Sequence, residues 1–143
     1  MVNRDLLAAK LAELAYRVGR VREHSKATAA ELGSDRDALD LVAFNLMLAV
    51  QTCADVASHV IADEKWPIAA TLGEAFDRLQ ERGVLTQETA GALGRAVGLR
   101  NVVAHGYGGI DVARVHGAAT RGIIDLEAFA RQVAGWATGG ARE

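Results

Sequence analysis

A single proline, Pro67, stands in a chain of 143 residues, and a chain with so few prolines is free to form long helices. Hydrophobic residues make up 50% of the sequence, with much alanine and leucine and little alternation of β-branched residues. They recur at spacings of three and four, which is the period of an amphipathic α-helix. The sequence therefore predicts an all-α fold, and its length fits one domain spanning residues 1–143.

Glycines, the proline and capping residues divide this pattern into about five helices, which we expect to form an up-and-down bundle. Their expected bounds are about 4–31, 35–63, 71–83, 87–106 and 111–139. The second helix stops at Trp66-Pro67, because the residue before a proline disfavours the helical region. Thr71 and Glu74 form a capping-box pattern at the start of the third helix, and Asp111 caps the fifth.

The net charge of −2 argues against a protein that coats nucleic acid non-specifically, since such binding relies on many lysine and arginine contacts to phosphate. It leaves room for a local RNA site. Cys53 is the single cysteine, so neither an internal disulfide nor a cysteine-built metal site is available. No two histidines have a convincing metal-ligand spacing, and we expect no metal and no cofactor.

The amino terminus, MVNRDLLAAKLAEL, lacks the basic start, apolar run and small-residue cleavage site of a signal peptide. The longest nearly apolar run, LDLVAFNLMLAV, contains Asn45 and is much shorter than the roughly 20 residues that span a bilayer. We therefore expect a cytoplasmic protein with no membrane partner.

The second expected helix carries apolar residues on two faces. One broad face is an ordinary core stripe, made of Leu39, Val42, Ala43, Leu46, Val50, Cys53, Ala57, Val60 and Ile61. The opposite face mixes apolar and polar residues: Leu41, Phe44, Leu48, Asn45, Gln51, Thr52, Asp55 and His59. Such a face suits a subunit interface or a cleft wall, because it would otherwise expose much apolar surface. The alternative is a plain surface face with a few exposed apolar residues, which is common.

The stretch GLRNVVAHGYGGID places polar residues where the fourth helix is expected to end. Asn101 and His105, four residues apart, share a helix face. Arg100 and His105 lie five residues apart and would point about 140° away from each other on an ideal helix. They can serve one site if the helix end distorts, if the long arginine reaches around, or if two chains contribute. The glycines that follow would permit the first of these.

Arginine with histidine, without acidic partners or cysteines, suits cleavage of RNA. The ribose 2′-hydroxyl supplies the nucleophile, a histidine can move a proton near neutral pH, and an arginine can hold the developing charge on phosphate. A symmetric dimer would supply a second histidine, so that one acts as base and the other as acid. The structural alternative is that these residues only stabilise a helix terminus, where histidine and asparagine are favoured.

The segment RNVVAHGY resembles the R-N-x-x-x-H-x-Y signature of the HEPN superfamily, and specifically its HepT toxin branch. The flanking helices are similar to that family over roughly residues 39–115. The resemblance implies an all-α bundle that forms a homodimer with both motifs in one cleft. It implies a metal-independent endoribonuclease toxin acting on tRNA or mRNA. It also implies a minimal nucleotidyltransferase antitoxin that can transfer AMP to the motif tyrosine.

Carried over residue by residue, the resemblance makes Arg100 and His105 the catalytic pair and Asn101 a polar organiser. It makes Tyr107 the candidate site of AMPylation. Asp55 and Asn45 match polar positions of the second helix that line the cleft.

The chain departs from the family at Gly106 and Gly108, where a bulky residue or glutamate and an aromatic residue are usual, so we expect a more open site. A second function, from another class, is a non-catalytic helical binding module that mainly partners a nucleotidyltransferase.

Overall fold

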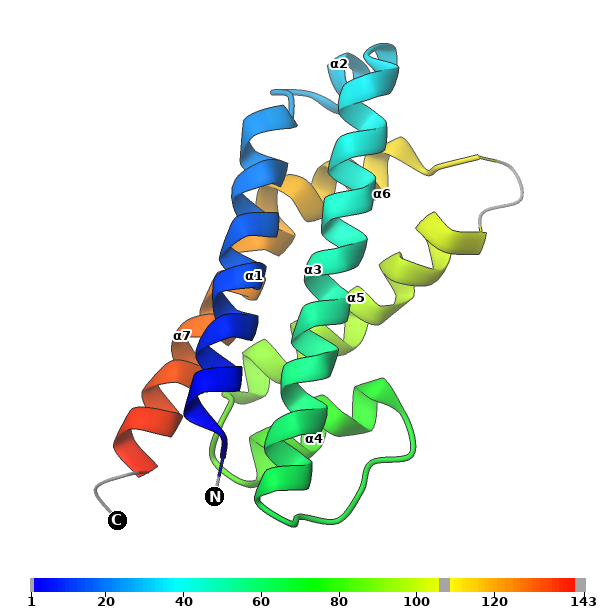
Figure 1. Ribbon diagram of the computed structural model, residues 1–143. Helices are drawn as coiled ribbons and strands as arrows, with labels where there is room; N and C mark the ends of the chain where they lie inside the picture. Colours follow the sequence, from blue (N-terminus) through cyan, green and yellow to red (C-terminus); the bar gives the residue numbers. More distant parts are fainter. Residues whose placement is uncertain (1, 106–108, 141–143) are drawn as a thin grey trace.

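The computed structural model describes residues 2–105 and 109–140, with the backbone alone for residues 100–105 and 140. The elements in chain order are α1 (Arg4–His24), α2 (Ala29–Ser34), α3 (Arg36–Asp63), α4 (Leu72–Glu81), α5 (Gln87–His105), α6 (Val112–Gly117), the π-helix η1 (Ala118–Gly122) and α7 (Ile123–Gly140). Every regular element in these ranges is helical, which confirms the predicted class. The long helices α1, α3, α5 and α7 alternate in direction along the chain (Figure 1).

The first predicted helix is wrong in its extent, because two helices occupy it. Ser25 adopts an extended backbone (φ −69°, ψ 158°) and ends α1. Thr28 then caps α2: its side chain accepts a hydrogen bond from the backbone N–H of Glu31 at 3.1 Å, and its hydroxyl donates to the Glu31 carboxylate at 3.0 Å. A capping residue followed three positions later by glutamate is a start signal that the periodicity alone did not reveal.

The centre of the bundle is α3, which contacts α1, α4, α5 and α7. All nine residues of the predicted core stripe are buried, so that prediction is confirmed. Within the described part of the chain, α3 alone is long and apolar enough to cross a membrane, but 61% of its most apolar window is buried inside the bundle. Its apolar composition is therefore explained by its central position.

The last predicted helix is continuous but irregular. Asp111 caps it as expected, with its carboxylate accepting from the Arg114 N–H at 3.2 Å. The π-helical segment 118–122 then separates α6 from α7. Such a segment holds an extra residue within a turn and shifts the faces of the helix that follows.

Aromatic and ionic contacts fix α7 against the remainder of the bundle. Phe129 meets Phe76 of α4 edge to face, with ring centroids 5.9 Å apart. Arg22 of α1 donates two hydrogen bonds to the Glu127 carboxylate. These hydrogen bonds lower the pKa of Glu127 and raise the pKa of Arg22.

Candidate functional site

The candidate site is at the C-terminal end of α5, whose N-terminal end is anchored to α7. The Gln132 side chain accepts from the Thr86 N–H at 3.0 Å and donates to the Thr89 hydroxyl at 2.8 Å. Thr86 in turn caps α5 by accepting from the Thr89 N–H at 3.2 Å. Leu93 and Leu99 are buried along the helix. From this fixed start α5 extends to the margin of the bundle, where the motif begins (Figure 1).

The backbone of α5 is α-helical through His105, so the helix predicted over residues 87–106 is present throughout its described part. Within a regular helix, the positions of Arg100 and His105 lie about 140° apart around the axis. A distorted helix end between these two residues is therefore not the means of bringing them together. Arg100 and His105 can then serve one site in two ways: the long arginine side chain can reach around the helix, or two chains can each contribute residues.

Beyond α5 the chain re-enters helical structure almost at once. Gly109 has a positive φ of 98°, a conformation that favours glycine, and Asp111 then begins α6. The motif is thus bracketed by α5 and α6. The side chains of Arg100, Asn101 and His105 are outside the described part of the structure, as is all of Tyr107, so the roles predicted for them stay predictions.

Asn45 is almost fully buried, with 2% of its surface exposed. Its side-chain oxygen accepts from the Arg17 guanidinium of α1 at 3.0 Å, and its amide donates to the Leu41 carbonyl at 2.8 Å. The same arginine pairs with Glu13 at 2.9 Å and lies over the Tyr16 ring. Asn45 therefore helps to hold α1 against α3.

Asp55 also faces α1. Its carboxylate accepts from Gln51 at 3.2 Å and lies 3.6 Å from the Lys10 ammonium. The contacts described for Asp55 and Asn45 are thus with α1 and with α3 itself. The structure does not show either residue meeting the motif, and their place in a cleft stays a prediction.

Fewer residues of the mixed face of α3 are exposed than the sequence indicated. Thr52, like Asn45, is buried, and its hydroxyl donates to the Leu48 carbonyl at 2.9 Å. Phe44 keeps 51% of its surface exposed, and Tyr16 of α1 keeps 56%. Each of these two helices therefore leaves a large aromatic side chain exposed.

Comparison with known proteins assigns the chain to a family. The family model described as Ribonuclease HepT-like matches residues 14–133, which include the whole bracketed motif. The chain belongs to the HepT-like family. The resemblance noted in the sequence is thereby confirmed.

Relatives of this HepT-like chain agree with it over most of their length. It is 24% identical to the mRNA nuclease HepT of Shewanella oneidensis over 125 residues, covering 87% of this chain and 93% of that protein. The structure of a tri-AMPylated HEPN toxin from the same organism, solved in complex with an MNT antitoxin, superimposes with a TM-score of 0.83 at 23% identity. That match covers 91% of this chain and 97% of the toxin.

YutE of Bacillus subtilis, a cytosolic protein of unknown function, matches with a TM-score of 0.81 at 12% identity. The match covers 94% of this chain and 90% of YutE. At these identities the structural matches establish the HEPN-type fold, and function has to be argued from the site.

We expect Asn45→Ala to lower the free energy of unfolding by about 1–3 kcal/mol, because it removes a buried hydrogen bond and deprives the Arg17 guanidinium of an acceptor. Asp55→Asn, at a partly exposed ion pair, should cost less than about 1 kcal/mol. Urea unfolding followed by circular dichroism measures both. A negligible loss for Asn45→Ala would contradict its role in joining α1 to α3.

Proposed function

We propose that this HepT-like protein is the toxin of a toxin–antitoxin pair and a metal-independent endoribonuclease. The observation that carries the proposal is the Arg100–His105 motif, which closes α5 in a chain matched by the HepT-like family model through the motif and both its flanks. The name of the Shewanella relative makes mRNA the first substrate to test, with tRNA as the second. The site is proposed to act in the cytoplasm, without a cofactor or a membrane partner.

In the proposed reaction the ribose 2′-oxygen forms a bond to the adjacent phosphorus while the bond from phosphorus to the 5′-oxygen breaks. One His105 accepts the 2′-hydroxyl proton, and the partner subunit's His105 donates a proton to the departing 5′-oxygen. Arg100 holds the non-bridging phosphate oxygens, on which charge develops, through paired hydrogen bonds. The products are a 2′,3′-cyclic phosphate and a 5′-hydroxyl, so no external nucleophile is required.

The homodimer is part of this proposal for two reasons. On a regular helix the positions of Arg100 and His105 lie about 140° apart, and a single motif offers one histidine where the reaction uses an acid and a base. A two-fold axis beside the α5 ends would bring two motifs together. The exposed Phe44, with the half-buried Leu41 and Leu48, supplies apolar surface that such an interface would cover.

The supporting residues act on the position of the motif. Asn101 shares a helix face with His105 and is proposed to organise the polar side of the cleft. Asn45 and Asp55 are proposed to support the cleft from α3, the helix on which α1 and α5 both pack.

Control by an antitoxin completes the proposal. A minimal nucleotidyltransferase partner transfers AMP from ATP to the Tyr107 hydroxyl: a bond forms between the tyrosine oxygen and the α-phosphorus, and pyrophosphate leaves. The added phosphate and base, close in sequence to His105, would compete with the RNA phosphate for Arg100 and block the cleft. The AMPylated state and MNT partner of the Shewanella toxin support this part.

We expect His105→Ala to lower the rate of RNA cleavage at least about 100-fold, since it removes the proton-transfer group. Arg100→Lys should lower the cleavage rate to a similar degree, because lysine keeps the charge but lacks the paired donors of the guanidinium. Cleavage of mRNA and tRNA by purified proteins, with growth arrest on expression, measures both. His24→Ala, which removes a histidine at the end of α1, away from the motif and from the mixed face of α3, is the matched control and should cleave like the wild type.

Equal cleavage by wild type and His105→Ala, with circular dichroism showing both folded, would contradict the catalytic assignment. A wild-type protein that cuts neither RNA but binds the nucleotidyltransferase would favour the non-catalytic binding module.

For Tyr107 we expect the phenylalanine variant, Tyr107→Phe, to stay toxic when antitoxin and ATP are present, because it keeps the ring but lacks the hydroxyl that accepts AMP. Intact-mass spectrometry of co-expressed proteins should show an AMP adduct on the wild type and none on the variant. Absence of the adduct from wild-type protein would refute modification here and leave occlusion by the antitoxin as the mode of neutralisation.

A further inference from the structure

A groove runs beside α5 on the side that faces the C-terminal segment. It has a volume of about 450 Å³ and lies between α5 and the run formed by α6, η1 and α7. Ala92, Ala96 and Leu99 give it a floor of small or apolar side chains. Its charged walls come from elements far apart in sequence, which are joined here by the packing of α5 on η1 and α7.

Three arginines line this groove: Arg95 from α5, Arg114 from α6 and Arg121 from η1. All three are exposed, and among the residues that the structure describes none of them has an ion-pair partner. Most basic residues elsewhere are neutralised by a carboxylate, namely Lys10, Arg17, Arg20, Arg22, Lys26, Arg36 and Arg78. All three guanidinium groups of the groove are therefore without a carboxylate partner among the described residues, whereas most basic residues elsewhere have one.

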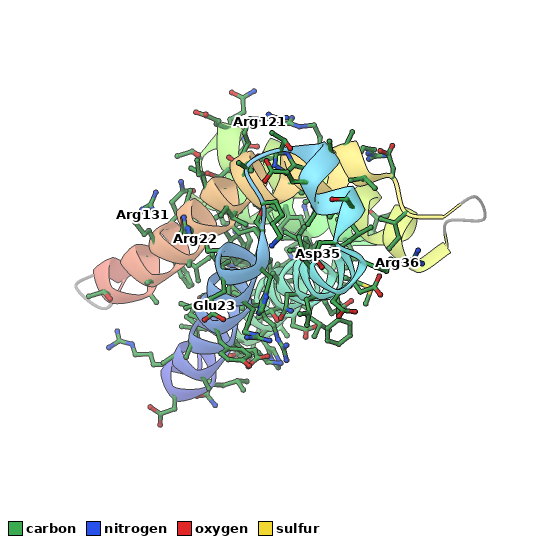
Figure 2. The ribbon with its side chains drawn as sticks, turned by 90° about the horizontal axis from the view of Figure 1, so that it is seen from above. Arg22, Glu23, Asp35, Arg36, Arg121 and Arg131 are labelled. Atoms are coloured by element: carbon green, nitrogen blue, oxygen red, sulfur yellow. The ribbon has the colours of Figure 1, made fainter. Side chains whose placement is uncertain are left out.

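Glycines allow these side chains to lie close to the helix surfaces. A Cβ on Gly117 would meet the Arg121 Nη2 at 3.0 Å, and one on Gly98 would lie 3.9 Å from the Arg114 Nη2. Arg114 thus reaches from α6 to the surface of α5. The π-helical turn of η1 carries Arg121, which lies at the upper edge of the molecule in Figure 2. Turns of this kind are frequent at functional sites.

Two carboxylates also line the groove, and they do not neutralise it. Asp111 is engaged in capping α6, where it accepts from the Arg114 backbone N–H. Asp125 lies four residues after Arg121 without a salt bridge to it among the described contacts. Three cations against two anions make the groove basic in a protein whose net charge is −2.

The groove leads to the motif. Arg100 follows Leu99 directly and lies four residues after Ala96, so its backbone position shares a helix face with a residue of the groove floor. From Arg95 to Arg100 the rise along the helix axis is about 7.5 Å. At the other wall, Asp111 caps α6 four residues after Tyr107, the last residue of the motif. A strand held in this groove would continue toward Arg100.

We propose that Arg95, Arg114 and Arg121 bind the phosphates of single-stranded RNA next to the cleavage point. This inference rests on the proposed ribonuclease function and adds a substrate-binding site to it. Guanidinium groups bind phosphate through paired hydrogen bonds, and a floor of alanine and leucine leaves room for the sugar–phosphate chain. Among its described lining residues the groove has no tryptophan or tyrosine, the aromatic anchors that are enriched at the hot spots of protein–protein interfaces, which favours RNA over an acidic protein surface.

The test compares two triple variants of the full-length chain. The groove variant is Arg95→Gln, Arg114→Gln and Arg121→Gln. The matched control removes the same charge at three exposed positions outside the groove, through Arg36→Gln, Lys65→Gln and Arg131→Gln. The probe is a short, mixed-sequence 2′-O-methyl RNA carrying fluorescein, which cannot be cut because it lacks the 2′-hydroxyl. Fluorescence anisotropy measures its Kd over a series of salt concentrations.

We expect the groove variant to bind the probe at least about tenfold more weakly than the control. The slope of log K against log salt should fall by about 2, since each phosphate contact to single-stranded nucleic acid contributes about 0.7. Equal Kd values and slopes for the two variants would overturn the inference. Unchanged RNA binding with lost antitoxin binding would overturn it as well and assign the groove to the protein partner.

The outcomes separate this inference from the proposed function. In one outcome the wild-type protein cleaves RNA and the groove variant binds and cuts it equally well. This result would refute the RNA-binding role of the groove and leave the nuclease proposal intact. Wild-type protein that neither binds the probe nor cuts RNA would refute both.

Discussion

The burial of α3 between α1, α4 and α5 is the interaction on which the rest of the structure depends. Residues such as Val42, Val56 and Val60 are fully buried, and every long helix packs on α3. Because α3 is fixed in this way, α5 has a defined direction, and the Gln132 contacts with Thr86 and Thr89 hold its start. The packing of α5 on α3 and the hydrogen bonds of Gln132 together set the position of the motif at the far end of α5.

The regular helical backbone of α5 also limits what a single chain can do. It carries Arg100 and His105 on different sides of one helix, while an acid–base reaction on RNA uses an arginine and two proton carriers near one phosphate. A dimer with facing motifs removes this conflict. The arginine groove extends the same logic, since it places phosphate-binding side chains on the face of α5 that continues to Arg100.

Much of the fold could be predicted from local signals. The core stripe of α3 and the Thr71 and Asp111 caps follow from periodicity and capping chemistry, and the structure has them all. The apolar periodicity does not predict the break after His24, because apolar residues continue at helical spacing beyond it. Thr28 and Glu31 carry the capping signal that marks the new helix. The π-helical turn was missed because one extra residue in a turn leaves little trace in a short pattern.

The site was only partly predictable. The motif could be read from the sequence, since its residues are adjacent along the chain. The family resemblance predicts a place in the cleft for Asn45, whereas the contacts that the structure describes for it depend on the packing of α1, and no pattern within α3 contains that information. The groove was missed for the same reason: Arg95, Arg114 and Arg121 are separated in sequence and meet only through tertiary packing.

The central claim is that two chains build one cleft, and a heterodimer tests it most directly. Wild-type and His105→Ala chains with different affinity tags are co-expressed, and dimers containing one of each are isolated by two successive purifications. A shared cleft that needs both histidines predicts that this heterodimer cleaves RNA at a small fraction of the wild-type rate. Cleavage at about half the wild-type rate, as two independent sites in a symmetric dimer would give, would contradict the account.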